Sequence, residues 1–279
     1  MRGGVWRTAA VIAGFAVGVV ATSCSASSPA ASSSRSSSAS RVTPQRAITL
    51  AADETEQVKT LSGTMSIQVG PSVSFSGPMR MQVKPALLLG GNLSASVDGL
   101  PAAISVVITS TALYIELPGG TGQPGKPWME ILFSSLSGNL GSALNQALQE
   151  TQSSNPLTQT RLLATSANVH EVGTAVVGGV STTEYSGIIS PAAAASALSP
   201  GFSKQLAPEL KMITGDISWD AWLDRQHMVR KLTEHETIDG QAAALAVTIT
   251  SVNQPVTVTV PPASQVTVTP ASVLYATAG

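Results

Sequence analysis

The stretch Leu61–Val69, LSGTMSIQV, decides the fold class of this chain. Its apolar residues alternate with small or polar ones, the period of a strand that is buried on one face only. The next stretch, Val73–Val83, repeats the alternation after a short turn. Two such strands in succession predict a hairpin, and therefore an antiparallel sheet with one apolar face.

The same alternation continues along the chain as far as residue 117. A turn is predicted at Thr109–Ala112, between two further runs. Four or five runs at hairpin spacing make an antiparallel meander. The side chains predicted to share its apolar face are Met65, Ile67, Val69, Phe75, Met79, Met81, Leu93, Ile104, Val106, Ile108, Leu113 and Ile115.

From Trp128 the apolar period changes to that of a helix. Leu136, Leu140 and Leu144 recur four residues apart, and we expect their stripe to face the sheet. Further helices are predicted over Thr43–Lys59, from Asn155-Pro156 to Leu163, and over Pro191–Ile213.

Strand patterns return in the second half of the chain. They cover Glu171–Val177, Val180–Ile188, Asp216–Leu223, Met228–Glu236, Ala243–Thr250 and Val256–Val260, and Pro261-Pro262 is expected to end the sheet. About ten antiparallel strands should curl strongly. The sequence therefore predicts an α+β fold: a large curved antiparallel sheet, or half-barrel, with helices covering its concave face. Residues 43–270 are expected to form one domain, and residues 271–279 a C-terminal tail.

The N-terminus has the pattern of a secretory signal peptide. Arg2 and Arg7 precede an apolar run that is too short for a transmembrane helix, and small residues lead up to Cys24, the only cysteine. This arrangement resembles a lipobox, although Ala21 stands where leucine is usual. We expect residues 1–23 to be removed and Cys24 to be acylated. The alternative is an ordinary signal peptide that leaves a free cysteine.

Residues 24–42 are rich in serine and alanine and cannot bury apolar surface, so they are expected to form a disordered tether. The chain carries a formal net charge of −1, and 11% of its residues are charged. Since it has no basic patch, nucleic acid is not an expected partner. No disulfide can form from a single cysteine.

Signals for catalysis or metal binding are weak. His170, His227 and His235 have no metal-ligand spacing, and the sequence lacks a nucleophile elbow. Gly120-x-Gly122-x-x-Gly125 matches a dinucleotide loop formally, but it lies between strands predicted to be antiparallel. Asp220 and Asp224 could act as an acid–base pair, although a turn-forming role for Asp224 is the simpler interpretation. We therefore expect no cofactor and no enzymatic activity, with an envelope hydrolase as the opposing hypothesis.

The excess of apolar residues on one sheet face has two interpretations. On the residues alone, a close-packed core between sheet and helices is preferred. A cavity under a curled sheet, beside helices broken by Gly138 and Gly141, is the functional alternative.

Several segments, taken in order, resemble the LppX/LprG lipoprotein family of actinobacteria, whose fold is similar to that of the carrier LolA. They are the acylated cysteine with its serine-rich tether, Thr111–Ile115, Trp128 after a Gly/Pro loop, Val180–Gly187, Ala221–Asp224, Val229–Leu232 and Val256–Pro262. The resemblance covers residues 47–265, and each motif alone is loose.

This resemblance implies a lipoprotein that binds acylated lipid or lipoglycan in the cavity and carries or presents it in the cell envelope. The implied location is the outer face of the cell membrane, held by the acyl anchor, with an envelope transporter as an expected partner. The alternative is a non-enzymatic structural or interaction lipoprotein with a packed core.

Overall fold

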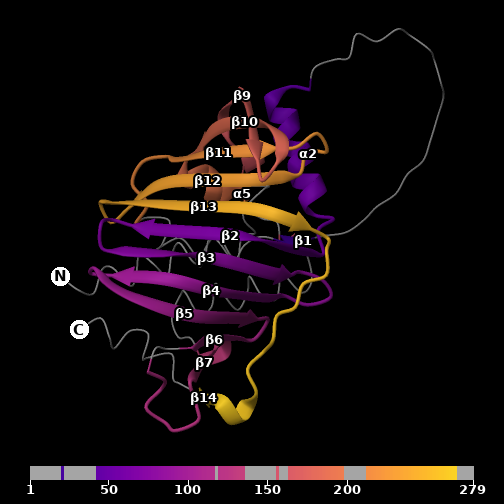
Figure 1. Cartoon of the computed structure of the whole chain (residues 1–279). Coiled ribbons are helices and arrows are strands. Elements are labelled where there is room, and N and C mark those ends of the chain that lie inside the picture. Colours follow the sequence, from indigo (N-terminus) through magenta and orange to yellow (C-terminus); the bar gives the residue numbers. More distant parts are fainter. Residues whose placement is uncertain are drawn as a thin grey trace.

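The computed structural model describes residues 20–21, 42–116, 119–135, 155–156, 163–197 and 212–268 of the chain. Its main feature is a 12-stranded sheet in the order β14-β7-β6-β5-β4-β3-β2-β13-β12-β11-β10-β9 (Figure 1). The sheet contains β2 (Thr60–Val69), β3 (Val73–Gln82), β4 (Leu88–Val97), β5 (Leu100–Thr109), β6 (Ala112–Glu116), β7 (Trp128–Leu132), β9 (Ala167–Val177), β10 (Val180–Ile189), β11 (Ile217–Leu223), β12 (Val229–Ile238), β13 (Gln241–Val252) and β14 (Val266–Val268). The predicted large antiparallel sheet is confirmed.

Every neighbouring pair in this sheet is antiparallel except β14 with β7, which is parallel. The chain forms two meanders, β2 to β7 and β9 to β13. They meet where β13 pairs with β2, so strands far apart in sequence join the halves. A separate two-stranded pair joins β1 (Val20–Ala21) to β8 (Asn155–Pro156). Because β1 lies within the predicted signal peptide, this pair would be lost on cleavage.

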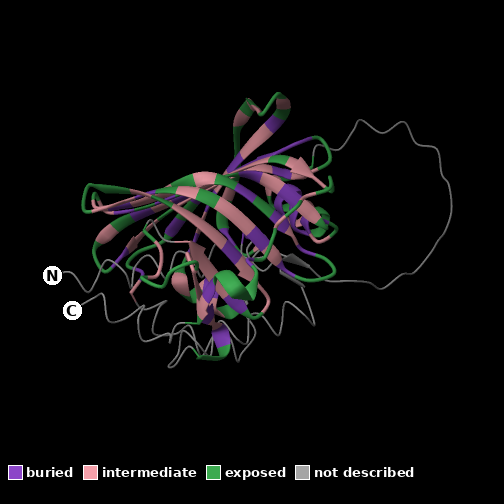
Figure 2. Cartoon of the chain, turned by 60° about the horizontal axis from the view of Figure 1, so that its bottom comes forward, coloured by how far each residue is buried: buried purple, intermediate pink, exposed green. Residues whose placement is uncertain are grey.

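The sheet bends into an arch (Figure 2). At three glycines the backbones of neighbouring strands come close together. A Cβ atom at Gly63 would overlap the carbonyl oxygen of Thr248, and one at Gly77 would overlap that of Asn92. At Gly91 the carbonyl oxygen of Pro78 would lie 2.9 Å from an added Cβ. These glycines share one face of the sheet, and only glycine permits such approaches on adjacent strands.

Helix α2 (Pro44–Thr55) begins as its sequence predicts. The Thr43 hydroxyl accepts a hydrogen bond from the Arg46 backbone N–H, and Pro44 occupies the first turn. Its buried face includes Ala47, Ile48 and Ala51, all in the main core cluster. In Figure 1 the helix stands beside one end of strands β9 to β11. The short helix α5 (Pro191–Ala197) contributes Ala194 to the same cluster.

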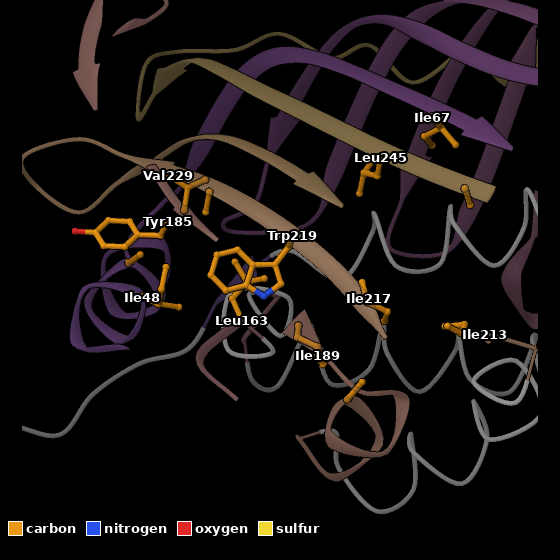
Figure 3. Packing of buried hydrophobic residues seen from close by; sticks show 14 of the residues in the cluster. Ile48, Ile67, Leu163, Tyr185, Ile189, Ile213, Ile217, Trp219, Val229 and Leu245 are labelled. Carbon is orange, nitrogen blue, oxygen red and sulfur yellow. The ribbon is translucent and has the colours of Figure 1, made fainter. Parts of the chain in front are cut away.

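Trp219 lies at the centre of this core cluster (Figure 3). Its side chain is fully buried, and its indole N–H donates a 2.7 Å hydrogen bond to the Ser166 hydroxyl. Gly187 lies directly opposite on β10, where an added Cβ would come 2.5 Å from a Trp219 ring carbon. The missing side chain at Gly187 is therefore what makes room for the indole.

Two of the predicted helical segments begin differently in the structure. Trp128–Leu132 is strand β7, paired with β6, so the prediction of a helix from Trp128 is wrong there. Residues Met129 and Ile131 alternate with Trp128 and Glu130, and pairing with β6 outweighs the helical period. Asn155-Pro156 forms β8 and not a helix start, because its backbone pairs with residues 20–21. Residues 133–135 form a 3₁₀ turn.

The C-terminal part also departs from expectation. Val256–Val260 is not a strand but part of a segment that runs from β13 to β14, drawn in yellow in Figure 1. Val258 lies over Gly90 on the outer face of the sheet. The sheet does not end at Pro261-Pro262, because a 3₁₀ turn (Ala263–Gln265) leads into β14. Gly90 has no side chain, and so it gives the crossing segment a place to pack.

The predicted helical cover of the concave face is not shown by the described residues. Helices α2 and α5 pack against one end of the sheet, while residues 136–154, 157–162 and 198–211, which were expected to form the cover, lie outside the described residues. Among the helices that the structure describes, none is long and apolar enough to cross a membrane.

Candidate functional site

The candidate site is the inner, concave face of the sheet. In the strand register, Met65 pairs with Gly77, Ile104 with Leu93, and Ile115 with Val106. Directly paired residues lie on the same face of a sheet. Continuing this register brings all twelve predicted strand residues, from Met65 to Ile115, onto the inner face.

Burial divides this face into two kinds of surface. Ile67, Val69, Met79 and Met81 are buried in two core clusters, one around Trp219 and one that includes Phe133. The other eight predicted residues keep part of their surface exposed: Met65, Phe75, Leu93, Ile104, Val106, Ile108, Leu113 and Ile115. Four of these eight side chains belong to neither cluster: Leu93, Ile104, Val106 and Ile115.

A row of partly exposed apolar residues crosses the inner face between the two core clusters. We call it the inner track, and it consists of Leu232, Val247, Met65, Gly77, Leu93 and Ile104, one from each strand from β12 to β5. Five strand spacings make it roughly 24 Å long, measured along the sheet. Gly77 has no side chain, and the side chain of Val247 is smaller than the Leu, Ile and Met side chains of the row. Leu232, Val247 and Met65 also pack against the core clusters, whereas Leu93 and Ile104 belong to neither.

The remaining predicted site residues cannot be placed. Leu136, Leu140 and Leu144, expected to face Val106, lie outside the described residues, as does the predicted lipid-attachment residue Cys24.

A hollow of about 470 Å³ lies over β4, β5 and the end of β6. Its lining consists of Asn92, Leu93, Ser94, Ala103, Ile104, Ser105 and Glu116. Five of these residues lie on the outer face by register, among them the paired Ser105 and Glu116. The hollow therefore belongs mainly to the outer face, and Leu93 and Ile104 of the inner face also contribute to its lining.

The outer face is not uniformly solvent-exposed. Val107 faces outward, as its strand position predicts, yet it is only 6% exposed. It pairs with Gly90 on one side and Tyr114 on the other, and Val258 covers Gly90. On the same surface Tyr114 donates a 2.8 Å hydrogen bond to Glu130; burial and that carboxylate raise the pKa of Tyr114 to about 12.

Sequence reasoning did not identify two acidic residues on the inner face. Glu234 pairs with Trp219 and Leu245, and Glu236 follows two residues later on the same side of β12. Burial raises the pKa of Glu236 to about 7. The sequence did not reveal Glu234 and Glu236 because β12 has the composition of a solvent-facing strand. Only its position between β11 and β13 shows which side chains the two carboxylates face.

Residues proposed for other chemistry occupy structural positions. Asp224 accepts hydrogen bonds from the backbone N–H groups of Gln226 and Met228 and forms a 2.7 Å ion pair with Arg230. Its predicted turn-forming role is confirmed. The glycines at 120, 122 and 125 lie in the loop that joins the antiparallel strands β6 and β7, so no parallel βαβ unit surrounds them.

His227 lies in the turn between β11 and β12, and His235 is exposed on β12 with Glu234 and Glu236 on the opposite face. Within the described ranges, no group of three or more His, Cys, Asp and Glu side chains could hold a metal ion.

Comparison with known proteins finds similarity at the level of structure. No protein-family model matches the chain, and no curated protein matches its sequence. The lipoprotein LppX of Mycobacterium tuberculosis superposes with a TM-score of 0.50 at 16% identity, over 77% of this chain and 98% of LppX. LprF from Mycobacterium bovis gives a TM-score of 0.49 at 14% identity, over 78% of this chain and 96% of LprF.

A LolA superfamily protein from Nitrosomonas europaea gives a TM-score of 0.28 at 8% identity, over 74% of this chain and 92% of that protein. The likeness to LppX shows a common fold, and it confirms, as a resemblance of fold, the similarity that the sequence motifs indicate.

Proposed function

We propose that this chain is a membrane-anchored lipoprotein that binds acylated lipid along the inner track and carries or presents it in the cell envelope. The observation that supports this most strongly is the inner track itself, an apolar row that crosses six strands and is left partly exposed from β12 to β5. The fold shared with the lipoprotein LppX is consistent with it.

The proposed binding is burial of hydrocarbon against apolar side chains. Each square ångström of apolar surface removed from water contributes about 25 cal/mol. The residues Leu93, Ile104, Val106 and Ile115 belong to neither packed cluster, so an acyl chain could lie on them without displacing the core. A packed core on part of the inner face and an incompletely packed apolar surface on the rest would let the fold stay stable while it exchanges a ligand.

The anchor and the tether complete the proposal. Acyl groups on Cys24 would hold the protein at the outer face of the cell membrane, since each buried methylene contributes roughly 0.8 kcal/mol. As a flexible chain, residues 24–42 would span roughly 20–25 Å. We propose that the protein is a carrier without enzymatic activity or a cofactor, and that an envelope transporter is its partner.

A non-enzymatic interaction module with a packed interior is the competing function. The fully buried cluster around Trp219, which includes Val69, Ala221 and Ile238, favours it at that end of the molecule.

The test is to produce the full-length chain in its native host, purify it in a detergent with no acyl chains of its own, and analyse organic extracts by mass spectrometry. Co-purification of an acylated lipid near one molecule per protein, displaced by a fluorescent fatty acyl probe, is the expected result. If no lipid co-purifies and the probe does not bind, the carrier proposal is wrong and the interaction module remains.

A further inference from the structure

The inner face carries an unusual side chain at Glu236. By register it lies between Ile217 of β11 and Ala243 of β13, which are 6% and 3% exposed. The next residue of β12 on the same face, Ile238, is fully buried and pairs with Ile213 through an isolated β-bridge. Figure 3 shows the neighbouring Ile213, Ile217 and Leu245 on the inner side of the sheet. Glu236 therefore places a carboxyl group among aliphatic side chains.

No side chain in the described part of the chain compensates this carboxyl group. The inner-face positions of the described strands β11, β13, β2 and β3 hold no charged residue, and no described residue donates a hydrogen bond to Glu236 or forms an ion pair with it. Burial is the cause of its raised pKa, which reaches about 7. A carboxyl group desolvated without a partner costs stability, and such groups are concentrated at functional sites.

The position of Glu236 relates it to the inner track. The track ends on β12 at Leu232, and two further inner-face positions, Glu234 and Glu236, follow on the same strand. At about 3.3 Å per residue, Glu236 lies roughly 13 Å from Leu232 along β12, to one side of that end of the track. Glu236 is partly exposed, in contrast to Ile217 and Ala243 beside it, so a ligand atom can reach the carboxyl group.

We propose that Glu236 is the headgroup contact of the lipid site, and that its carboxyl group hydrogen-bonds a hydroxyl group of the bound lipid. This inference rests on the proposed function. A hydroxyl group fits because it donates to a carboxylate and accepts from a carboxylic acid, so it satisfies Glu236 in either form. A lipid whose polar end is fully esterified cannot donate this bond. The site therefore selects lipids with a free hydroxyl in the headgroup, with the polar end along β12 and the acyl chains on the inner track.

The experiment compares two probes that differ in one hydroxyl group, 1,2-dipalmitoylglycerol and 1,2-dipalmitoyl-3-acetylglycerol. Each competes with a fluorescent fatty acyl probe on the full-length protein. The wild-type protein should bind dipalmitoylglycerol at least about tenfold more tightly, the ratio that one hydrogen bond to a buried acceptor supports. Glu236→Leu and Glu236→Ala should lose this preference and still bind the acyl probe. Glu236→Gln keeps a carbonyl acceptor and should keep part of the preference.

Glu184→Leu is the matched control, because it removes a carboxylate from the outer face, where Glu184 pairs with Trp222. It should leave the preference unchanged. Melting curves check folding, and Glu236→Leu should melt no lower than wild type because its unpartnered carboxyl group is gone. If a folded Glu236→Leu or Glu236→Ala retains the wild-type preference, the role of Glu236 is overturned while the carrier function stands. If wild type binds neither lipid nor the acyl probe, both proposals fail.

Discussion

At the scale of the residue, the space around Gly187 is occupied by the ring of Trp219. The indole is fully buried and hydrogen-bonded to Ser166, so it cannot move away without breaking that bond or exposing apolar surface. We expect Gly187→Ala to lower the free energy of unfolding by about 1–3 kcal/mol, the usual cost of overpacking. Urea denaturation followed by tryptophan fluorescence measures this change.

Gly173 on β9 provides the control, because an added Cβ there meets no atom within 4 Å. Gly173→Ala should change the free energy of unfolding by less than about 0.5 kcal/mol. Equal losses in both variants would show that the space around Gly187 is not limiting.

Glu236 makes the stability of the protein depend on pH. The pKa of Glu236 is about 7 in the folded state against an ordinary value of 4.5, so the folded state binds the proton more tightly. The contribution of Glu236 to the free energy of unfolding should therefore be most favourable below pH 4.5. It should fall as the pH rises from about 4.5 to about 7, by up to about 3 kcal/mol.

Urea denaturation of ligand-free protein at pH 5 and pH 7.5 measures the effect, and Glu236→Gln should reduce the difference between the two values. A Glu236→Gln variant with the wild-type pH dependence would assign the effect to other groups.

At the scale of the element, strand β5 presents Ile104 to the inner track and Ala103 to the outer face. Ile104 is partly exposed and belongs to no packed cluster, so Ile104→Trp should fold with a melting temperature within a few degrees of wild type. The indole should occupy part of the acyl site and weaken binding of a fluorescent fatty acyl probe at least about fivefold, because apolar contact area is lost to the ligand.

Ala103→Trp is the control on the same strand, since Ala103 is exposed on the outer face, and it should bind the probe as wild type does. Val107, although it also faces outward, is unsuitable because it is buried beside Gly90 and Tyr114. A well-folded Ile104→Trp with undiminished binding would remove Ile104 from the lipid site. Severe unfolding would indicate a packed interior.

At the scale of the whole molecule, the proposed carrier depends on its anchor. Cys24→Ala removes the thiol that the lipobox-like sequence offers for acylation. In Triton X-114 partitioning we expect wild type to stay in the detergent phase and the variant to leave it. Two or three acyl chains hold a protein firmly in a bilayer, and the variant lacks them. Identical partitioning of the two into the aqueous phase would contradict the anchor.

The meander from β2 to β6 and the sharing of one face by its apolar residues could be predicted from the sequence. Alternation with period two is a local property, and each hairpin joins strands that are adjacent in the chain. The turn role of Asp224 could be predicted for the same reason, since its partners Gln226, Met228 and Arg230 lie within six residues. The acylation of Cys24 also rests on local sequence alone, and it stays a prediction.

Only the tertiary structure decided the other features. Trp128–Leu132 became a strand because β6 offered it a partner, and Val256–Val260 stayed outside the sheet, in the segment that places Val258 over the bare backbone of Gly90. The inner face divides into a packed core and the inner track because β13 pairs with β2, a strand far away in the sequence. Glu236 owes its apolar surroundings to the buried Ile217 of β11 and Ala243 of β13, which lie on either side of it. Burial depends on which distant segments meet, and a local pattern carries no information about that.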